Sequence, residues 1–150
     1  MKKKVMALVL SALMVTGLVG CGNNNDNSAD SKESTLKVGM ITDSGTIDDK
    51  SFNQGTWEGI IEAEEKLGIE KNYLKPSGET EADYLTEIQN LYDSGYKFIV
   101  GPGFKLETAI YKAQEKYQDA KFVILDGAPM DEDGNYVVAD NTVAIQFAEH

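Results

Sequence analysis

Residues 96–125 read YKFIVGPGFKLETAIYKAQEKYQDAKFVIL, and this stretch decides the fold. It begins with a mainly apolar run from Tyr96 to Val100 and ends with another from Lys121 to Leu125, each of a length typical of a buried strand. Between the two runs, apolar residues recur at the spacing of one helix face: Leu106, Ala109, Ile110, Ala113 and Tyr117. A strand, a helix and a second strand in this order predict parallel strands joined by a right-handed crossover.

The same alternation extends toward the N-terminus. Residues 36–42 predict a first strand, because they are apolar and bounded by polar sequence on both sides. A helix is predicted to follow, in which Ser51 and Gln54 form a capping box and Gly68 is the stop signal. This segment therefore supplies another strand and another helix of the same kind.

A second strand is predicted at residues 72–75, between these two units. Thr80 and Asp83 mark the capped start of a further helix, which Gly95 closes. The resulting order is strand, helix, strand, helix, strand, helix, strand. It predicts the α/β class, with a doubly wound parallel sheet that carries helices on both faces.

Composition excludes several classes of function. The 150 residues, of 16.4 kDa, are enough for one ordinary domain and too few for two. All 14 basic residues are lysines, and the 25 acidic residues give a net charge of −11, which would repel a nucleic acid. One cysteine and one histidine leave no pair for a disulfide, a Cys/His zinc site or a Cys–His nucleophile. We expect no nucleic-acid partner, no metal and no other cofactor.

The N-terminus has the features of a bacterial export signal. Three lysines after Met1 precede an apolar run over residues 5–20, which is too short for a stable membrane-spanning helix. The run leads into Leu18-Val19-Gly20-Cys21, which resembles a lipobox and makes Cys21 the expected lipidation site. The alternative is an ordinary cleaved signal with a chance cysteine. We therefore expect a signal peptide over 1–20 and a lipid anchor on the extracytoplasmic face of the bacterial cell membrane.

The region after Cys21 differs from both its neighbours in composition. Residues 21–35 are rich in Asn, Ser and Asp and contain almost no large apolar side chain. A segment of this composition cannot pack into a core, so we expect a flexible tether. The folded part is then expected to span residues 36–150.

Ligands of doubly wound sheets bind outside the carboxyl ends of the strands. Four segments are predicted to leave those ends: residues 43–49, 76–78, 101–104 and 126–127. The carboxylates of Asp43, Asp48, Asp49 and Asp126 would oppose a phosphate there, so an uncharged or cationic ligand is favoured. The predicted domain contains no histidine or cysteine before His150 to act as a nucleophile or base, so no catalytic residue is assigned and an enzyme is not expected.

Several of these residues have both a structural and a functional interpretation. Phe52, at a predicted helix start, is either a core contact or a platform on which a ligand ring stacks. Asp126 is either a turn cap or an acceptor for the two hydroxyls of a vicinal diol. The glycines in 101–103 either let a ligand approach the backbone or only form a tight turn. The acidic segment 131–135 is interpreted as a hairpin turn rather than a calcium site.

The motifs together resemble a known family. Val38-Gly39-Met40-Ile41-Thr42-Asp43 leads through Asp48-Asp49-Lys50-Ser51-Phe52-Asn53-Gln54 to Trp57-Glu58-Gly59, behind a lipobox and a polar tether. This sequence is similar to the basic membrane protein family of bacterial lipoproteins, which are purine nucleoside receptors for ABC transporters. Gly101-Pro102-Gly103-Phe104 and Leu125-Asp126-Gly127 add to the resemblance, which spans residues 36–147.

The resemblance implies a type I periplasmic-binding-protein fold, in which two doubly wound lobes close on a ligand. Residues 36–150 would be the N-terminal lobe, truncated before the second, and the partners would be a purine nucleoside and an ABC transporter permease. Six positions match the family's ligand pocket: Asp43 as a ligand hydrogen-bonding residue, Ser44 as a small polar lining residue, Phe52 as the stacking ring, Asn53 as a polar neighbour of the base, Phe104, and Asp126 as the ribose acceptor.

Two other readings share most of these features. A type I binding protein for a free sugar or a furanone signal would have the same sheet, the same export signal and Asp126, and would differ in having no base in its ligand. An extracellular carboxylate-dependent hydrolase would turn a nucleoside into base and sugar instead of retaining it.

Overall fold

The computed structural model describes residues 35–147. The predicted signal peptide, the lipidation site Cys21 and all but the last residue of the predicted tether lie outside the described residues. In the part of the chain that is described, no helix combines the length and the apolar character needed to cross a bilayer.

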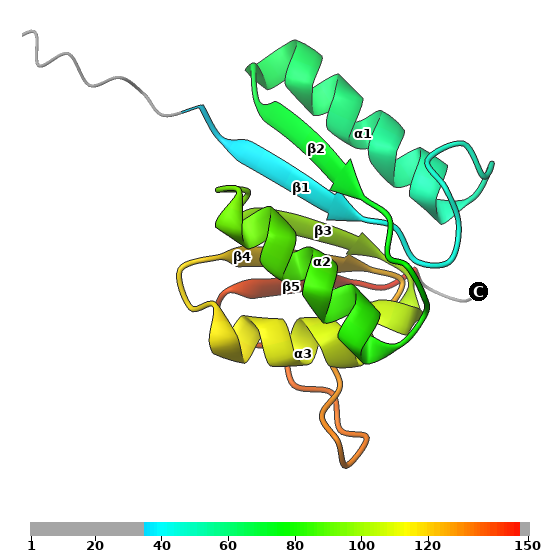
Figure 1. Cartoon of the computed structure of the whole chain (residues 1–150), viewed down its shortest axis with the longest axis vertical. Coiled ribbons are helices and arrows are strands. Elements are labelled where there is room, and N and C mark those ends of the chain that lie inside the picture. Colours follow the sequence, from blue (N-terminus) through cyan, green and yellow to red (C-terminus); the bar gives the residue numbers. More distant parts are fainter. Residues whose placement is uncertain (1–34, 148–150) are drawn as a thin grey trace, which may run out of the picture. The chain divides into compact units, whose positions relative to one another are not determined.

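Five parallel strands form one sheet in the order β2-β1-β3-β4-β5 (Figure 1). In chain order the elements are β1 (Lys37–Ile41), α1 (Phe52–Leu67), β2 (Glu70–Leu74), α2 (Glu81–Asp93), β3 (Phe98–Pro102), the 3-10 turn η1 (Phe104–Leu106), α3 (Glu107–Lys116), β4 (Lys121–Leu125) and β5 (Thr142–Ile145). The strand order reverses between β1 and β3, which is the topological switch point of such sheets. The predicted α/β class and doubly wound parallel sheet are confirmed.

The fifth strand was not predicted. β5 pairs with β4 from Thr142 opposite Phe122 to Ile145 opposite Leu125. It has four residues and follows a connection without a helix, so neither its length nor the strand–helix alternation indicated it. The second strand also begins earlier than predicted, at Glu70, because polar residues are tolerated on an edge strand.

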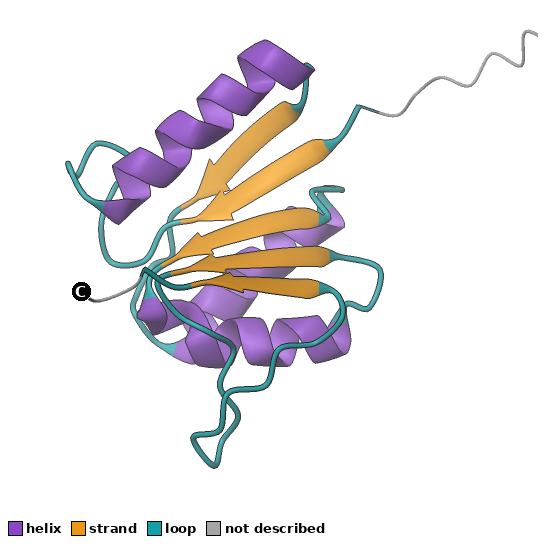
Figure 2. Ribbon diagram, turned by 180° about the vertical axis from the view of Figure 1, so that it is seen from behind, coloured by secondary structure: helices purple, strands orange, loops and turns teal. Residues whose placement is uncertain are grey.

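Helices α2 and α3 cover one face of the sheet, which we call the closed face (Figure 2). Buried side chains from the sheet and from both helices meet there: Ile99, Phe122 and Ile124 from the strands, Ile88 and Leu91 from α2, and Ala109, Ile110 and Ala113 from α3. Gly101 lies under this layer, and a Cβ there would come within 2.9 Å of Ile110 and 3.0 Å of Leu106. Neither interpretation of the glycines holds for Gly101, which lies within β3 and leaves room for the Leu106 and Ile110 side chains.

Helix α1 alone covers the other face, which we call the open face (Figure 2). Its cluster joins Ile60 of α1 to Val38 and Met40 of β1 and Val100 of β3. Beyond α1, apolar side chains of β5 remain in contact with solvent: Val143 is 55% exposed and Ile145 is 44% exposed.

The two capping predictions had different outcomes. At α2 the predicted capping box is present, because the Thr80 side chain accepts from the backbone N–H of Asp83 and the Asp83 side chain accepts from that of Thr80. At α1 the prediction was wrong, because the Ser51 side chain makes no capping bond. Asp49 supplies the cap instead, since its Oδ1 accepts from the backbone N–H groups of Ser51 and Gln54, at 2.8 and 3.2 Å.

The acidic segment 131–135 forms the predicted turn. The backbone N–H of Asp131 donates to the carbonyl of Asn135 at 2.9 Å, and an antiparallel bridge joins Met130 to Tyr136 beside it. The Asp131 carboxylate accepts from the backbone N–H groups of Asp133 and Asn135, so its oxygens are committed to the turn.

Candidate ligand-binding site

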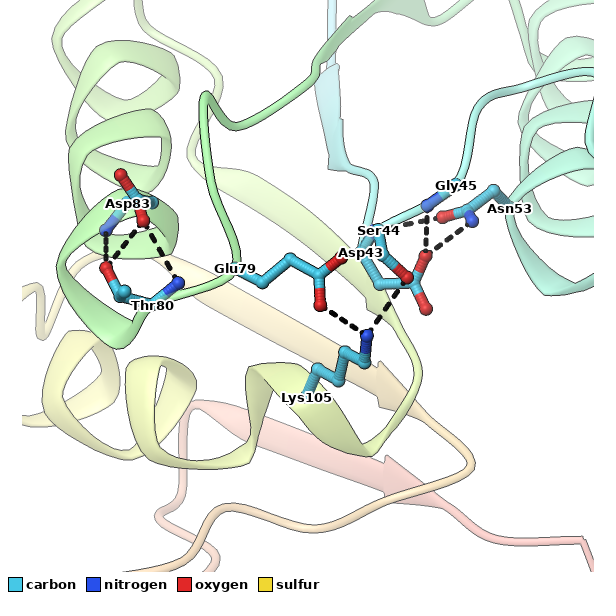
Figure 3. Close-up of polar contacts among 8 residues, drawn as sticks. All are labelled: Asp43, Ser44, Gly45, Asn53, Glu79, Thr80, Asp83 and Lys105. Carbon is cyan, nitrogen blue, oxygen red and sulfur yellow. Dashed lines mark hydrogen bonds and ion pairs between the residues drawn. The ribbon is translucent and has the colours of Figure 1, made fainter.

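The segments that were expected to bind a ligand meet at one edge of the sheet. All five strands run parallel, so the loops after β1, β2, β3 and β4 leave from the same carboxyl edge. Figure 3 shows the loop after β1, the segment before α2 and the residue Lys105 of η1 side by side there.

The loop after β1 is held by a pair of residues, Asp43 and Asn53. The backbone N–H of Asp43 donates to Asn53 Oδ1 at 3.1 Å, and Asn53 Nδ2 donates back to Asp43 Oδ1 at 2.7 Å. Asp43 Oδ1 also accepts from the backbone N–H of Gly45 at 2.8 Å (Figure 3). The second oxygen, Oδ2, accepts no hydrogen bond from the described residues, so the half-buried Asp43 carboxylate keeps one acceptor for a ligand.

Asn53 is committed to the protein rather than to open space. It is 2% exposed, and its second Nδ2 proton goes to Asp49 Oδ2 at 2.6 Å. Gly45 packs so closely on this amide and on Asp49 that a Cβ at Gly45 would overlap both side chains. The structure thus gives Asn53 the role of positioning the Asp43 carboxylate.

Asp49 is the third member of this arrangement. Partial burial opposes ionisation of its carboxyl, but hydrogen bonds from Asn53 and from the backbone of Ser51 and Gln54 outweigh it and hold the pKa of Asp49 below its usual range. A charged carboxylate at the start of α1 also interacts favourably with the positive end of the helix dipole. Asp49 therefore ties the loop to the helix.

Ser44 lies in a contact that joins three segments. Lys105 of η1 donates to Ser44 Oγ at 3.1 Å and pairs with Glu79 Oε2 at 2.6 Å (Figure 3). Glu79 directly precedes the capped start of α2, so the ammonium group links the loops after β1, β2 and β3. The sequence offered no signal for this ion pair, because Glu79 and Lys105 are distant in the chain and belong to no motif.

Phe52 lines an apolar hollow where α1 begins. Its ring is 45% exposed and stacks on Phe147, with centroids 5.6 Å apart and an angle of 19° between the planes. The hollow has a volume of about 450 Å³ and is lined mainly by Ser51, Phe52, Gly55, Thr56, Leu125 and Phe147. Phe147 was not predicted as a site residue; the available signal was its spacing of two residues from Ile145 and four from Val143, in an apolar segment at the end of the sheet.

Asp126 follows Leu125 directly and has an unusual backbone. Its φ is +56°, in the left-handed region that Asp tolerates better than most residues. The backbone N–H of Asp126 donates to the carbonyl of Ile145 at 2.7 Å, while its half-buried carboxylate accepts no hydrogen bond from the described residues. The turn therefore depends on the backbone of Asp126 and leaves both carboxylate oxygens available.

Phe104 stands between the Asp43 and Asp126 loops. Its ring is 65% exposed, and its Cα would lie 3.2 Å from a Cβ at Gly127. On its other side is Gly103, whose φ of +95° suits glycine, and where a Cβ would lie 3.4 Å from Asp43 Oδ2. Close backbone packing thus brings the loops after β1, β3 and β4 together.

The apolar core next to this edge contains two hydroxyl groups without partners in the described part of the chain. The hydroxyl groups of Thr42 and Tyr84 are buried without a hydrogen-bond partner among the described residues. Burial raises the pKa of Tyr84 to about 12, and the carboxylates of Glu79, Asp43 and Asp83 add to the increase. The Tyr84 phenol therefore stays neutral, and these acids surround it with negative potential.

The predicted residues lie at one edge of the sheet in two groups. Asp43, Ser44 and Asn53 form one hydrogen-bonded group with Lys105 nearby, and Phe52 lines the hollow next to the Asp126 turn. The edge offers carboxylate acceptors and exposed aromatic rings, a combination that can bind hydroxyl or amino groups and a flat ring. Among residues 35–147, no group of His, Cys, Asp and Glu has the arrangement of a metal site.

Comparison with known proteins adds independent findings. The sequence profile of the family described as "ABC transporter substrate-binding protein PnrA-like" matches residues 36–150. The chain is 36% identical, over 160 aligned residues, to the CD4+ T-cell-stimulating antigen of Listeria innocua, covering 100% of this chain and 42% of that protein. It is 34% identical to the ABC transporter nucleoside-binding protein BmpA of Lactococcus lactis, with 88% and 39% covered.

A solved structure has a similar fold. An ABC transporter solute-binding protein from Aeropyrum pernix K1 superimposes with a TM-score of 0.61 at 25% identity, covering 73% of this chain and 28% of that one. The chain spans about two fifths of the length of the two sequence relatives described above, 42% and 39%.

Proposed function

Because the chain belongs to the PnrA-like family of ABC transporter substrate-binding proteins, we propose that it is the N-terminal lobe of a receptor for a purine nucleoside. The receptor hands its ligand to a transporter permease and performs no chemistry on it. Cys21 carries the lipid that holds it on the extracytoplasmic face of the cell membrane. Relatives from Pyrococcus named as lipoproteins support the anchor, and the printed name of the Lactococcus relative supports the ligand.

One observation carries the proposal for the ligand. Two half-buried carboxylates, Asp43 and Asp126, keep oxygens that no described residue uses, and the exposed rings of Phe52 and Phe104 lie at the same edge. A purine nucleoside needs both kinds of group, because its ribose presents two vicinal hydroxyls and its base presents a flat ring. We assign Asp126 to the ribose, Asp43 to polar groups of the ligand, and Phe52 to stacking on the base.

Asn53, Ser44 and Phe104 complete the proposed site. Asn53 acts through Asp43, which it holds in place, and Ser44 and Phe104 line the pocket from the loops after β1 and β3. The chain covers 42% and 39% of two relatives, and we assign the ligand groups that face away from this edge to a second lobe of the full-length protein.

Titration calorimetry on the full-length protein tests the proposal. The ligands are adenosine, guanosine and inosine, their 5′-monophosphates, free ribose and a furanone. Nucleoside binding without turnover is the expected result. Preferential binding of ribose or the furanone would show that the ligand is a sugar or a furanone and not a nucleoside. Release of free base would identify a hydrolase.

The ribose assignment is tested with Asp126→Asn, which keeps the shape and replaces one acceptor oxygen with a donor. This substitution should lower the affinity for ribonucleosides much more than the affinity for their 2′,3′-dideoxy analogues. Equal weakening of both would contradict the diol role.

A further inference from the structure

The ion pair between Glu79 and Lys105 stands beside the proposed pocket and has no assigned role. Lys105 directly follows Phe104, and its ammonium donates to Ser44 Oγ at 3.1 Å and to Glu79 Oε2 at 2.6 Å (Figure 3). Lys50 and Lys75 also lie at this edge of the sheet, but the ammonium of Lys105 is the one that contacts a residue of the proposed pocket among the described residues.

The position of Glu79 is fixed by its neighbours. The next residue, Thr80, opens the capping box of α2 with Asp83, and Ser77 donates to Asp83 Oδ1 at 3.2 Å. Gly78 packs against the same carboxylate, so that a Cβ there would lie 2.5 Å from Asp83 Oδ2. The segment before α2 is therefore held to the helix from several sides, and Glu79 is presented to Lys105 on a fixed backbone.

The charges at this edge would otherwise suit a different ligand. A lysine ammonium next to a serine hydroxyl is an arrangement that binds a phosphate well, because both groups donate hydrogen bonds to its oxygens. Glu79 neutralises that ammonium, so the ion pair offers a phosphate no net attraction, and a phosphate would have to displace the Glu79 carboxylate to bind Lys105. The pairing converts a potential phosphate contact into a barrier.

Resting on the proposed nucleoside site, we propose that Glu79 is a specificity-determining residue, which excludes nucleoside monophosphates by keeping the Lys105 ammonium in an ion pair. Discrimination against the wrong ligand then comes from a competing carboxylate placed at the pocket, and not from a missing contact alone. The ligand class that this residue selects is the uncharged nucleoside.

The experiment measures binding of inosine and inosine 5′-monophosphate to the full-length protein by calorimetry. In Glu79→Gln, Lys105 loses its charged partner, and the ratio of monophosphate to nucleoside affinity should increase by about tenfold, judged from the strength of charge-assisted hydrogen bonds. Nucleoside affinity itself should change by less than about threefold. The gain should shrink at high salt, because the contact is partly exposed and therefore screened.

Two further variants serve as controls. Glu79→Gln combined with Lys105→Met should show no gain, because the ammonium is gone. Glu62→Gln makes the same charge change and releases Lys66 on the exposed part of α1, so it should leave the ratio unchanged. An unchanged ratio in Glu79→Gln, or an equal gain in the double variant, would overturn the inference while nucleoside binding stands. Failure of the wild type to bind any nucleoside would overturn the proposed function and this inference with it.

Discussion

The two faces of the sheet differ in how far helices cover them. On the closed face, α2 and α3 cover the apolar side chains of the strands beneath them, and Ile124 of β4 is 0% exposed. On the open face, α1 covers β1 and β3, while Ile145 of the edge strand β5 is 44% exposed. Two differences explain the contrast: helices cover Ile124 and not Ile145, and β4 is paired on both sides whereas β5 is paired with β4 alone.

This difference separates stability from recognition. The closed face holds most of the buried apolar residues, so we expect it to contribute most of the stability of the fold. The open face presents exposed apolar side chains, and its edge merges into the hollow that contains Phe52 and Phe147. Exposed apolar surface of this kind marks a region that contacts something else.

The largest expected effect compares Ile124→Ala with Ile145→Ala in the chain of residues 22–150. Ile124→Ala removes a fully buried side chain, so the free energy of unfolding should decrease by about 2–5 kcal/mol. Ile145→Ala should cost less than about 1 kcal/mol, because its side chain is already in partial contact with water. Urea unfolding of both variants measures the difference. Equal losses would show that the open face is covered in solution.

The second prediction concerns association through the open face. Residues 22–150 expressed alone should self-associate, and Val143→Lys should weaken that association by about tenfold or more, since it puts a charge into a desolvated contact. Leu67→Lys is the matched control, because Leu67 is exposed at the far end of α1. Sedimentation velocity checks both. Loss of association in the control alone would point to another surface.

The N-termini of α2, on the closed face, and α1, on the open face, are capped by different residues. Thr80→Ala removes the capping oxygen of α2 and should cost about 1 kcal/mol of stability. Ser51→Ala at the start of α1 should cost only a few tenths of that amount, because the Ser51 side chain makes no capping bond. Thermal unfolding measures both variants. A larger loss for Ser51→Ala would mean that Asp49 does not cap α1.

The smallest expected effect is a pH dependence that both helix starts share. Hydrogen bonds from the Thr80 side chain and backbone lower the pKa of Asp83 from its ordinary 3.8. A group with a lowered folded pKa contributes stability above the unfolded value and loses it as pH falls through the folded value. Stability should therefore decline below about pH 4, and less steeply in Asp83→Asn, when melting temperatures are followed from pH 6 to pH 2.

An unchanged slope in Asp83→Asn would contradict the role of this carboxylate. Thr80→Ala should also flatten the decline, since its hydroxyl no longer donates to Asp83. The same measurement on Asp49→Asn extends the comparison to the open face, where the pKa of Asp49 is lowered too.

The closed face was the more predictable of the two. The helical spacing of Ile110 and Ala113 and the continuous apolar run that contains Ile124 identified the strand–helix–strand unit, because a helix buried on one face repeats about every 3.6 residues and a buried parallel strand is apolar throughout. The Thr80 box was also predictable, since both of its partners lie within one turn. Local patterns therefore gave the elements that bury the most surface.

The candidate site was predictable in composition and less so in its contacts. The rule that ligands bind at the carboxyl ends of strands led to Asp43 and Asp126. The pairing of Asn53 with Asp43, and of Lys105 with Glu79, depends on where loops distant in sequence meet, which no local spacing encodes. β5 escaped prediction for a related reason, because a short strand on an open face needs no long apolar run.

In the proposed site a purine base stacks on Phe52 at the carboxyl edge of the sheet. Calorimetry of guanosine, adenosine and inosine on the full-length wild type and on Phe52→Ala measures this contact, with melting temperatures recorded alongside. Phe52→Ala should lose roughly 1–3 kcal/mol of binding free energy, the usual contribution of base stacking on an aromatic side chain, with little change in melting temperature. Unchanged binding together with a lower melting temperature would contradict it and would identify Phe52 as a packing residue.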